Sequence, residues 1–150
     1  MSVNHDSSES QKPYAQEGYA LMGAAFEVHK VLGGGLLEDI YQEAMEIELG
    51  LRGIPFVSKE GLATFYKNMR LKKHYEPDLL VYQRIVAELK SVRELIPDHE
   101  AQLMNYMRLT RKPVGYLVNF GPITKVEWKR FVLSEYLEPF PPNIKPISAD

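Results

Sequence analysis

The sequence predicts an α/β domain in which a mixed central β-sheet is flanked by helices. Apolar residues recur at helical spacing in two segments, from about residue 14 to 31 and from 36 to 52. Short apolar, β-branched runs follow, and a third helical segment then precedes two more such runs. This order is typical of a layered α/β domain. The composition, 45% hydrophobic and 25% charged in 150 residues, suits one domain with a sizeable core.

The two ends of the chain differ from this pattern. Residues 1–12 are polar and rich in serine without periodicity, so we expect a disordered leader. Residues 138–150 contain four of the ten prolines, which predicts an extended or disordered tail. The folded domain is therefore expected over residues 13–137.

Glycines mark the ends of the first two helices. The first helix is expected to stop at Gly33–Gly35, because three consecutive glycines end a helix. The second is expected to end at Gly50 or Gly53. Its first turn contains Glu38, and an acid there is favoured by the helix dipole. By itself, Glu38 therefore fits a purely structural role.

A cationic segment follows the second helix. An extended stretch and a turn over residues 66–69 lead to a predicted strand from Arg70 to Tyr75. Lys67, Arg70, Lys72 and Lys73 come close together in this segment without an intervening acid. Such a run is usually a solvated face or a charged edge strand, and the alternative is contact with nucleic-acid phosphates. The net charge of −2 neither favours nor excludes nucleic acid.

A β-hairpin is predicted around the polar corner Gln83–Arg84, between two apolar runs. A two-residue turn at this corner would set Asp78 opposite Leu89. A three-residue turn, or a one-residue bulge, would instead set Asp78 opposite Glu88. Since Pro77 is a residue typical of edges and bulges, we predict that Asp78 and Glu88 share a face.

Three charges lie at the open end of this hairpin. Asp78 opens the first strand, whose apolar run is 79–82, while Glu88 and Lys90 close the second, whose run is 85–89. Residues two apart in a strand point to the same face, so Glu88 and Lys90 emerge together. Charges are costly in a buried strand unless they have partners or a metal. Two carboxylates and an ammonium on one face therefore predict a site.

The third helix is expected to begin at Pro97–Asp98, because proline and an acid suit a first turn. In this helix Gln102 and Tyr106 are four residues apart and lie on one face. Taken alone, they fit the surface and the rim of the core. Strands expected at 113–119 and 126–133 complete the sheet.

Several function classes are disfavoured. The absence of cysteine excludes disulfides and thiolate metal sites. No apolar run approaches the roughly 20 residues that span a bilayer, and no signal-peptide pattern is found, so no membrane association is expected and a cytoplasmic location is the default. The four histidines lack metal-ligand spacing, and Gly33–Gly35 lacks the spacing of a phosphate-cradling loop. A small-molecule enzyme of another class is therefore a poor fit.

Four motifs together resemble one enzyme superfamily. Pro77-Asp78 followed by Glu88-Leu89-Lys90 resembles the signature of the PD-(D/E)XK nucleases. Gly35-Leu36-Leu37-Glu38-Asp39-Ile40-Tyr41 resembles the motif of its GxxExxY family, and Gln102-Leu103-Met104-Asn105-Tyr106 resembles the QxxxY motif of its exonuclease-like members. The likeness spans roughly residues 14–133. It implies a restriction-endonuclease-like core, in which a mixed four-stranded sheet is flanked by helices.

The resemblance implies a site that binds Mg²⁺ or Mn²⁺. Asp78 and Glu88 would supply carboxylates to the metal, and the Leu89 carbonyl would supply a further oxygen. Lys90 would orient the attacking water or stabilise charge that develops on phosphorus. Glu38 would bind a second metal or hold one of the waters around the first.

The third helix and a set of cations would complete this site. Gln102 would position phosphate or water, and Tyr106 would pack and hydrogen-bond beside it. The candidates for contact with the nucleic-acid backbone are Lys67, Arg70, Lys72, Lys73, Arg108, Arg111 and Lys112.

The first hypothesis is therefore a metal-dependent nuclease that hydrolyses phosphodiester bonds, with DNA preferred over RNA as substrate. The rival is a non-catalytic module that uses the same fold to bind nucleic acid or a protein, with the acidic cluster as a structural network. The small size leaves little surface for a substrate without a partner or a second copy, so a homodimer stays open. No aromatic-interleaved basic strip or reading helix stands out, and sequence-specific recognition is not predicted.

Overall fold

The computed structural model describes residues 12–137, which begin with helices α1 (Ala15–Leu32) and α2 (Glu38–Leu51). Gly33 ends α1 with a φ of 80°, and its N–H donates to a carbonyl of the last turn, as the glycine run predicts. The predicted leader, as far as residue 11, and the predicted tail over 138–150 lie outside the described residues. No helix in the described part of the chain is long and apolar enough to cross a membrane.

A five-stranded mixed sheet forms the centre of the domain, in the spatial order β1-β4-β5-β6-β7. The strands are β1 (Phe56–Ser58), β4 (Leu79–Val81), β5 (Ile85–Lys90), β6 (Val114–Asn119) and β7 (Glu127–Val132). β5 and β6 run parallel, joined by helix α3 (Pro97–Thr110), and the other neighbouring pairs are antiparallel. The predicted α/β class, with a mixed sheet flanked by helices, is confirmed.

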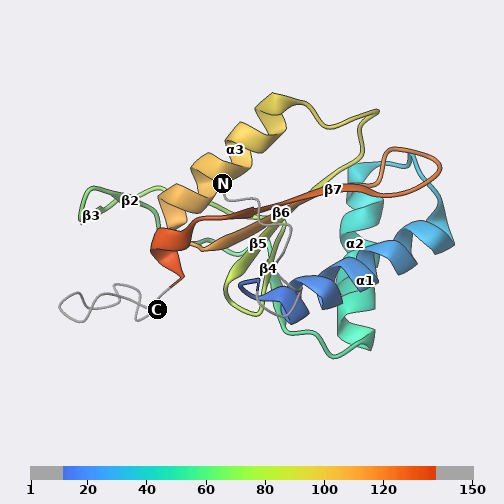
Figure 1. Cartoon of the computed structure of the whole chain (residues 1–150), viewed down its shortest axis with the longest axis horizontal. Helices are drawn as coiled ribbons and strands as arrows, with labels where there is room; N and C mark the ends of the chain where they lie inside the picture. The colour runs from blue at the N-terminus through green and yellow to red at the C-terminus, as the bar shows by residue number, and fades with distance from the viewer. Residues whose placement is uncertain (1–11, 138–150) are drawn as a thin grey trace.

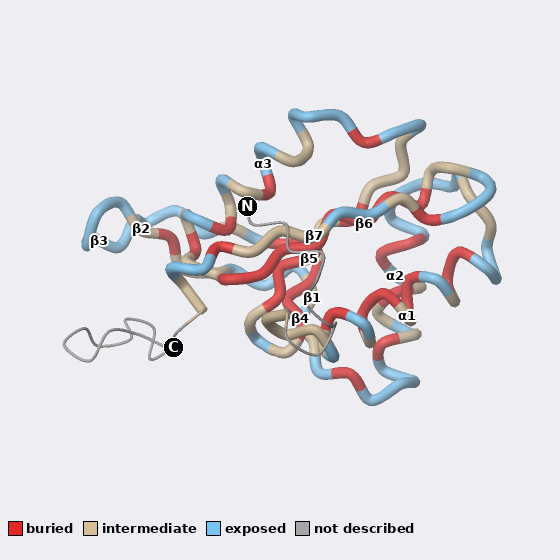
Figure 2. Tube along the Cα trace, viewed as in Figure 1, coloured by how far each residue is buried: buried red, intermediate tan, exposed pale blue. Residues whose placement is uncertain are grey.

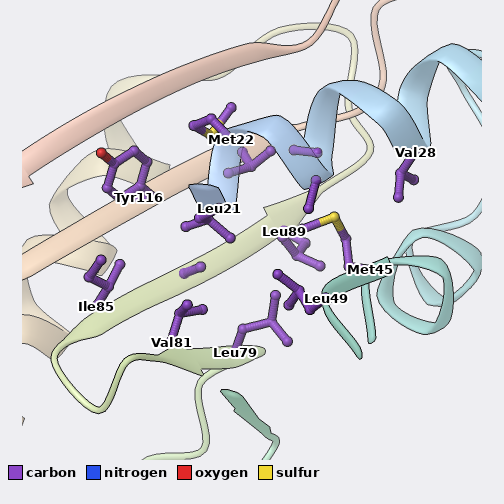
Figure 3. Packing of buried hydrophobic residues seen from close by; sticks show 14 of the residues in the cluster. Leu21, Met22, Val28, Met45, Leu49, Leu79, Val81, Ile85, Leu89 and Tyr116 are labelled. Atoms are coloured by element: carbon purple, nitrogen blue, oxygen red, sulfur yellow. The ribbon is translucent and has the colours of Figure 1, made fainter. Parts of the chain in front are cut away.

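Helices cover both faces of this sheet (Figure 1). α1 and α2 pack on one face, where residues such as Leu21, Met45 and Leu89 form the larger apolar core (Figure 3). α3 packs on the other face, where Leu103 and Met107 meet the smaller core. Because successive residues of a strand point to opposite faces, β5 contributes to both cores.

The segment between β1 and β4 differs from the prediction. β2 (Phe65–Tyr66) and β3 (Met69–Arg70) form a separate two-stranded hairpin. The strand predicted from Arg70 to Tyr75 is wrong over 71–74, because these exposed residues have no partner in the central sheet. Only at Tyr75 does the chain pair again, with Leu62 in a single antiparallel bridge.

Candidate functional site

The β4–β5 hairpin sets the geometry of the site. Val81 pairs with Ile85, so the turn between the two strands consists of the three residues 82–84. This is one of the two turn lengths that the sequence leaves open, and the observed register confirms it. Continued one pair past the end of β4, the same register places Asp78 opposite Glu88.

Backbone groups of the two strands hold these carboxylates. The Leu89 N–H donates to Oδ2 of Asp78 at 2.8 Å, and the Asp78 N–H donates to Oε2 of Glu88 at 3.4 Å. Nζ of Lys59, a residue that belongs to none of the four motifs, lies 3.5 Å from Oδ1 of Asp78. The two acids are therefore oriented across the strand pair by the fold itself.

Tyr75 connects the acid pair to α3. Its hydroxyl donates a hydrogen bond to Oε2 of Glu88. Its ring stacks on that of Tyr106, with the ring centroids 3.9 Å apart and the planes 19° from parallel. Tyr106, which its motif predicted to be a site residue, thus contacts the acid pair through Tyr75. Tyr75 itself belongs to none of the four motifs. The contact depends on how the segment before Asp78 and α3 lie relative to each other, and no local pattern of the sequence contains that information.

Burial and the neighbouring acid shape the charge of the site. Burial, followed by the charge of Asp78, raises the pKa of Glu88 from its ordinary value of 4.5 to about 8. The hydrogen bonds from Tyr75 and from the Asp78 backbone oppose this rise. Burial and the nearby Glu88 raise the pKa of the Tyr75 hydroxyl above its usual range, so it stays a donor. A cation between the two carboxylates would relieve their repulsion and favour ionised Glu88.

The donor set fits a single divalent cation. Within residues 12–137, no three His, Cys, Asp or Glu side chains come together as a group that could hold a metal ion. Asp78 and Glu88 therefore form a pair of acids, and Glu38 does not lie close enough to make a group of three. A pair is compatible with Mg²⁺, which proteins usually hold by one or two carboxylates while waters and substrate phosphate fill its other positions.

Pro77 leaves a further oxygen available in this site. Continued two pairs past the end of β4, the register places Pro77 opposite Leu89, and proline has no N–H to donate to the ladder. In a strand, the N–H and C=O of one residue point to the same side, and the Leu89 N–H points to Asp78. The Leu89 carbonyl therefore also faces the Asp78 side, where Pro77 offers it no backbone donor.

Lys90 is the last residue of β5 and lies two positions after Glu88, so both side chains leave the same face of the sheet. Its carbonyl accepts a 2.8 Å hydrogen bond from the Phe120 N–H, which ties the strand end to β6. The Lys90 side chain is half-buried. Its backbone is therefore held firmly, while the side chain still reaches solvent.

The start of α2 lies beside the acid pair. Glu38, the first residue of the helix, is exposed, and Ser91 donates a hydrogen bond to the Leu36 carbonyl just before it. One turn later, Nε2 of Gln42 donates to the Asp78 carbonyl at 2.9 Å. Glu38 and Gln42 are four residues apart and share a face, so Glu38 is directed toward the Asp78 end of the hairpin. This four-residue spacing could have identified Gln42 from the sequence.

The predicted α3 residues differ in their placement. Tyr106 is half-buried against Tyr75, whereas Gln102, one turn earlier, is exposed. Arg108 is also exposed, and its Nη1 donates to Oδ1 of Asn105 at 2.9 Å. Of the predicted helix residues, the structure thus brings Tyr106 to the carboxylates by way of Tyr75.

Arg111 and Lys112, two neighbouring cations predicted to contact nucleic acid, lie at different parts of the surface. Arg111 contacts the β2–β3 hairpin, where its Nη2 donates to the Lys67 carbonyl at 2.5 Å. Lys112 instead donates to the Gln83 carbonyl at 3.3 Å, in the β4–β5 turn, and burial followed by the charge of Arg84 lowers its pKa. At ~3.3 Å per strand residue, that turn is roughly 16 Å from Glu88. Lys112 is therefore remote from the acid pair.

Comparisons with known proteins identify the class. A family model described as the PD-(D/E)XK nuclease superfamily matches residues 15–131, and the chain belongs to this superfamily. A solved structure described as "Crystal structure of SSO0001" is similar with 20% sequence identity and a TM-score of 0.49. The match covers 79% of this chain and 59% of that chain, so this chain spans less than two thirds of its length. No curated protein matches the sequence.

Proposed function

We propose that the protein is a metal-dependent nuclease that hydrolyses phosphodiester bonds, with DNA as its preferred substrate. Membership of the nuclease superfamily supports this class of reaction. The observation that supports it most in this chain is the pairing of Asp78 and Glu88 across β4 and β5, with Lys90 on the same face. The motif from Gly35 to Tyr41 supports the finer assignment to the GxxExxY family.

Asp78, Glu88 and the Leu89 carbonyl are the groups that would hold Mg²⁺ or Mn²⁺. When bound, the ion would polarise the scissile phosphate and lower the pKa of a water molecule. Tyr75 keeps Oε2 of Glu88 in place, and Gln42 does the same for the Asp78 backbone. In this proposal the exposed Glu38 would hold a further water or a second ion at the rim of the site.

Lys90 is the proposed partner of the reacting groups. Its ammonium would donate hydrogen bonds to the attacking water, or to phosphate oxygens on which negative charge develops. In hydrolysis the water oxygen bonds to phosphorus, the bond from phosphorus to the leaving oxygen breaks, and the leaving oxygen gains a proton. Tyr106 would support the Tyr75 ring, and Gln102 would contact phosphate or water from α3.

A second candidate function, a non-catalytic binding module, has specific support in the contacts of the two acids. Each carboxylate of the pair already has a partner in the protein, since Lys59 lies beside Asp78 and Tyr75 donates to Glu88. The same contacts would serve a structural network in a non-catalytic binding module. The two candidates differ in metal affinity, because a structural network should be indifferent to Mn²⁺. Calorimetric titration of Mn²⁺ into the wild type and into Asp78→Asn separates them.

The decisive experiment is cleavage of labelled single-stranded and duplex DNA and RNA with Mg²⁺ or Mn²⁺. We expect cutting by the wild type and a loss of at least ~100-fold in Asp78→Asn and in Lys90→Ala. Lys125→Ala is the matched control, because Lys125 is an exposed lysine outside the site. Cutting that persists in both site variants would refute the proposal. Absence of cutting together with absence of Mn²⁺ binding would favour the binding module.

A further inference from the structure

The segment from Leu62 to Tyr75 forms an arm that leaves the central sheet and returns to the acid pair. At its base, the Leu62 N–H donates to the Tyr75 carbonyl at 2.7 Å and the Tyr75 N–H donates back at 3.1 Å. At its tip, β2 and β3 pair around a turn at Lys67–Asn68. Figure 1 shows this hairpin projecting from the body beside the end of α3. Tyr75, at the base of the arm, is also the residue whose hydroxyl donates to Glu88.

Contacts with the body hold the arm in place. Arg111 donates to the Lys67 carbonyl at 2.5 Å and places its guanidinium 4.7 Å from the centroid of the Phe65 ring. Across the arm, the Leu71 N–H donates to the Thr64 carbonyl at 2.8 Å. An isolated two-stranded hairpin is marginally stable in water. These contacts therefore present the tip as an ordered element of the surface.

The tip exposes large apolar side chains together with cations. Tyr66 is 63% exposed and Met69 is 69% exposed, in a hairpin whose surface is open to solvent (Figure 2). Nζ of Lys67 lies 5.6 Å from the centroid of the Tyr66 ring. From Gly61 to Tyr75 the chain has no acid. The hairpin thus interleaves apolar and cationic side chains, a strip that the linear sequence did not reveal.

We propose that this tip grips a nucleic-acid strand with unpaired bases. Tyr66 and Met69 would contact the flat apolar faces of bases, and Lys67, Arg70 and the nearby lysines would contact phosphates. A nucleic acid matches both features, since it offers negative charge at every step and an apolar face between charges. An acidic peptide would match the cations alone.

The length of the arm places this grip relative to the acid pair. Tyr66 lies four positions after Leu62 at the bridge, which corresponds to about 13 Å at ~3.3 Å per residue. Nucleotides of a stacked strand are spaced by ~3.4 Å along its axis, so this distance corresponds to about four stacked nucleotides. This part of the inference rests on the proposed function, and it predicts that Tyr66 contacts the substrate about four nucleotides from the bond that is cut.

The test is fluorescence anisotropy of labelled oligonucleotides with the full chain in EDTA, so that binding is measured without cleavage. Tyr66→Ala should weaken binding to single-stranded DNA about tenfold and to blunt duplex much less. Tyr66→Phe should bind like the wild type, because it keeps the ring. Tyr19→Ala is the matched control, since Tyr19 is an exposed tyrosine on α1. Lys67→Ala should reduce the slope of log affinity against log salt by about one.

Several results would overturn the grip. One such result is that no oligonucleotide binds. Others are equal affinity of Tyr66→Ala and the wild type, or equal losses of affinity in Tyr19→Ala and Tyr66→Ala. Competition by poly-glutamate as effective as competition by single-stranded DNA would also overturn it.

Binding that depends on Tyr66 without any cleavage would leave the grip standing and refute the nuclease. Cleavage with binding independent of Tyr66 would refute the grip alone. With an active enzyme, Tyr66→Ala should lose its effect on substrates shortened to fewer than about four nucleotides on one side of the cut.

Discussion

The two faces of the central sheet are built from the same strands and differ in character at the end of β5. On the face under α1 and α2, β5 contributes Ala87 and Leu89, which are 0% and 1% exposed. On the face under α3, the same strand contributes Glu88 and Lys90, which are only partly buried. Strand alternation thus lets one short strand support both the core and the candidate site.

The difference follows from how much helix covers each face. In the described residues two α-helices cover the apolar face, whereas one α-helix, α3, covers the other and meets Val86 through Leu103 and Met107. Past this contact the end of β5 is covered by the rings of Tyr75 and Tyr106. A face that one helix covers leaves room for polar groups and for a substrate. Substitutions on the two faces should therefore act on different properties.

The largest effect is expected on the apolar face. Leu89→Ala should lower the free energy of unfolding by about 2–5 kcal/mol, because it leaves a cavity between the sheet and the helices. Urea denaturation measures this loss. The control is Leu37→Ala, at a leucine that is 74% exposed, which should change stability by no more than about 0.5 kcal/mol. A loss below 1 kcal/mol in Leu89→Ala would mean that the comparison of the two faces is wrong.

On the polar face, stability should depend on pH through Glu88. Its pKa is raised to about 8 in the folded protein, so its stabilising contribution is complete below about 4.5 and is lost as the pH rises through 8. In EDTA, the free energy of unfolding should fall by roughly 2–5 kcal/mol between pH 5 and pH 9. Glu88→Gln should remove this fall, and Mg²⁺ should reduce it in the wild type. Identical pH profiles for wild type and Glu88→Gln would contradict the prediction.

Local sequence patterns predicted much of this polar face. The hairpin followed from two apolar runs around a polar corner, and the shared face of Asp78 and Glu88 followed from a three-residue turn, one of the two turn lengths left open, with Pro77 favouring an irregularity before Asp78. Strand alternation then placed Lys90 with Glu88. The functional roles of these residues stay predictions, since they depend on substrate and metal.

Contacts between distant segments were beyond local patterns. Glu88 and Asp78 meet their partners Tyr75, Gln42 and Lys59 only because the segment before Asp78, α2 and the chain just after β1 come together at the open end of the hairpin. The strand expected from Arg70 to Tyr75 failed for the same reason, since β propensity alone does not supply a neighbouring strand. The exposure of Gln102 likewise depends on how α3 lies over the sheet.

A smaller effect is expected at Tyr75, the contact between the arm and the acids. Tyr75→Phe keeps the ring stacked on Tyr106 and removes the hydroxyl that donates to Glu88, so cleavage should fall about tenfold with little change in stability. In the wild type this hydrogen bond lowers the pKa of Glu88, so its loss should raise that pKa and move the pH profile of cleavage to higher pH. Tyr82→Phe, in the turn at the opposite end of the hairpin, is the control. An unshifted profile in Tyr75→Phe would show that the hydroxyl does not position Glu88.

The smallest effect is expected at Gln42, where a helix of the apolar face contacts the site. Gln42→Ala removes the donor to the Asp78 carbonyl and should lower the free energy of unfolding by about 1 kcal/mol. Glu43→Ala, at the exposed neighbouring position, is the control for helix propensity. Because this carbonyl belongs to the residue that would bind metal, Mn²⁺ affinity should fall in Gln42→Ala and stay unchanged in Glu43→Ala. Equal affinity in both variants would mean that the apolar face stabilises the domain without positioning Asp78, and that the two faces act independently.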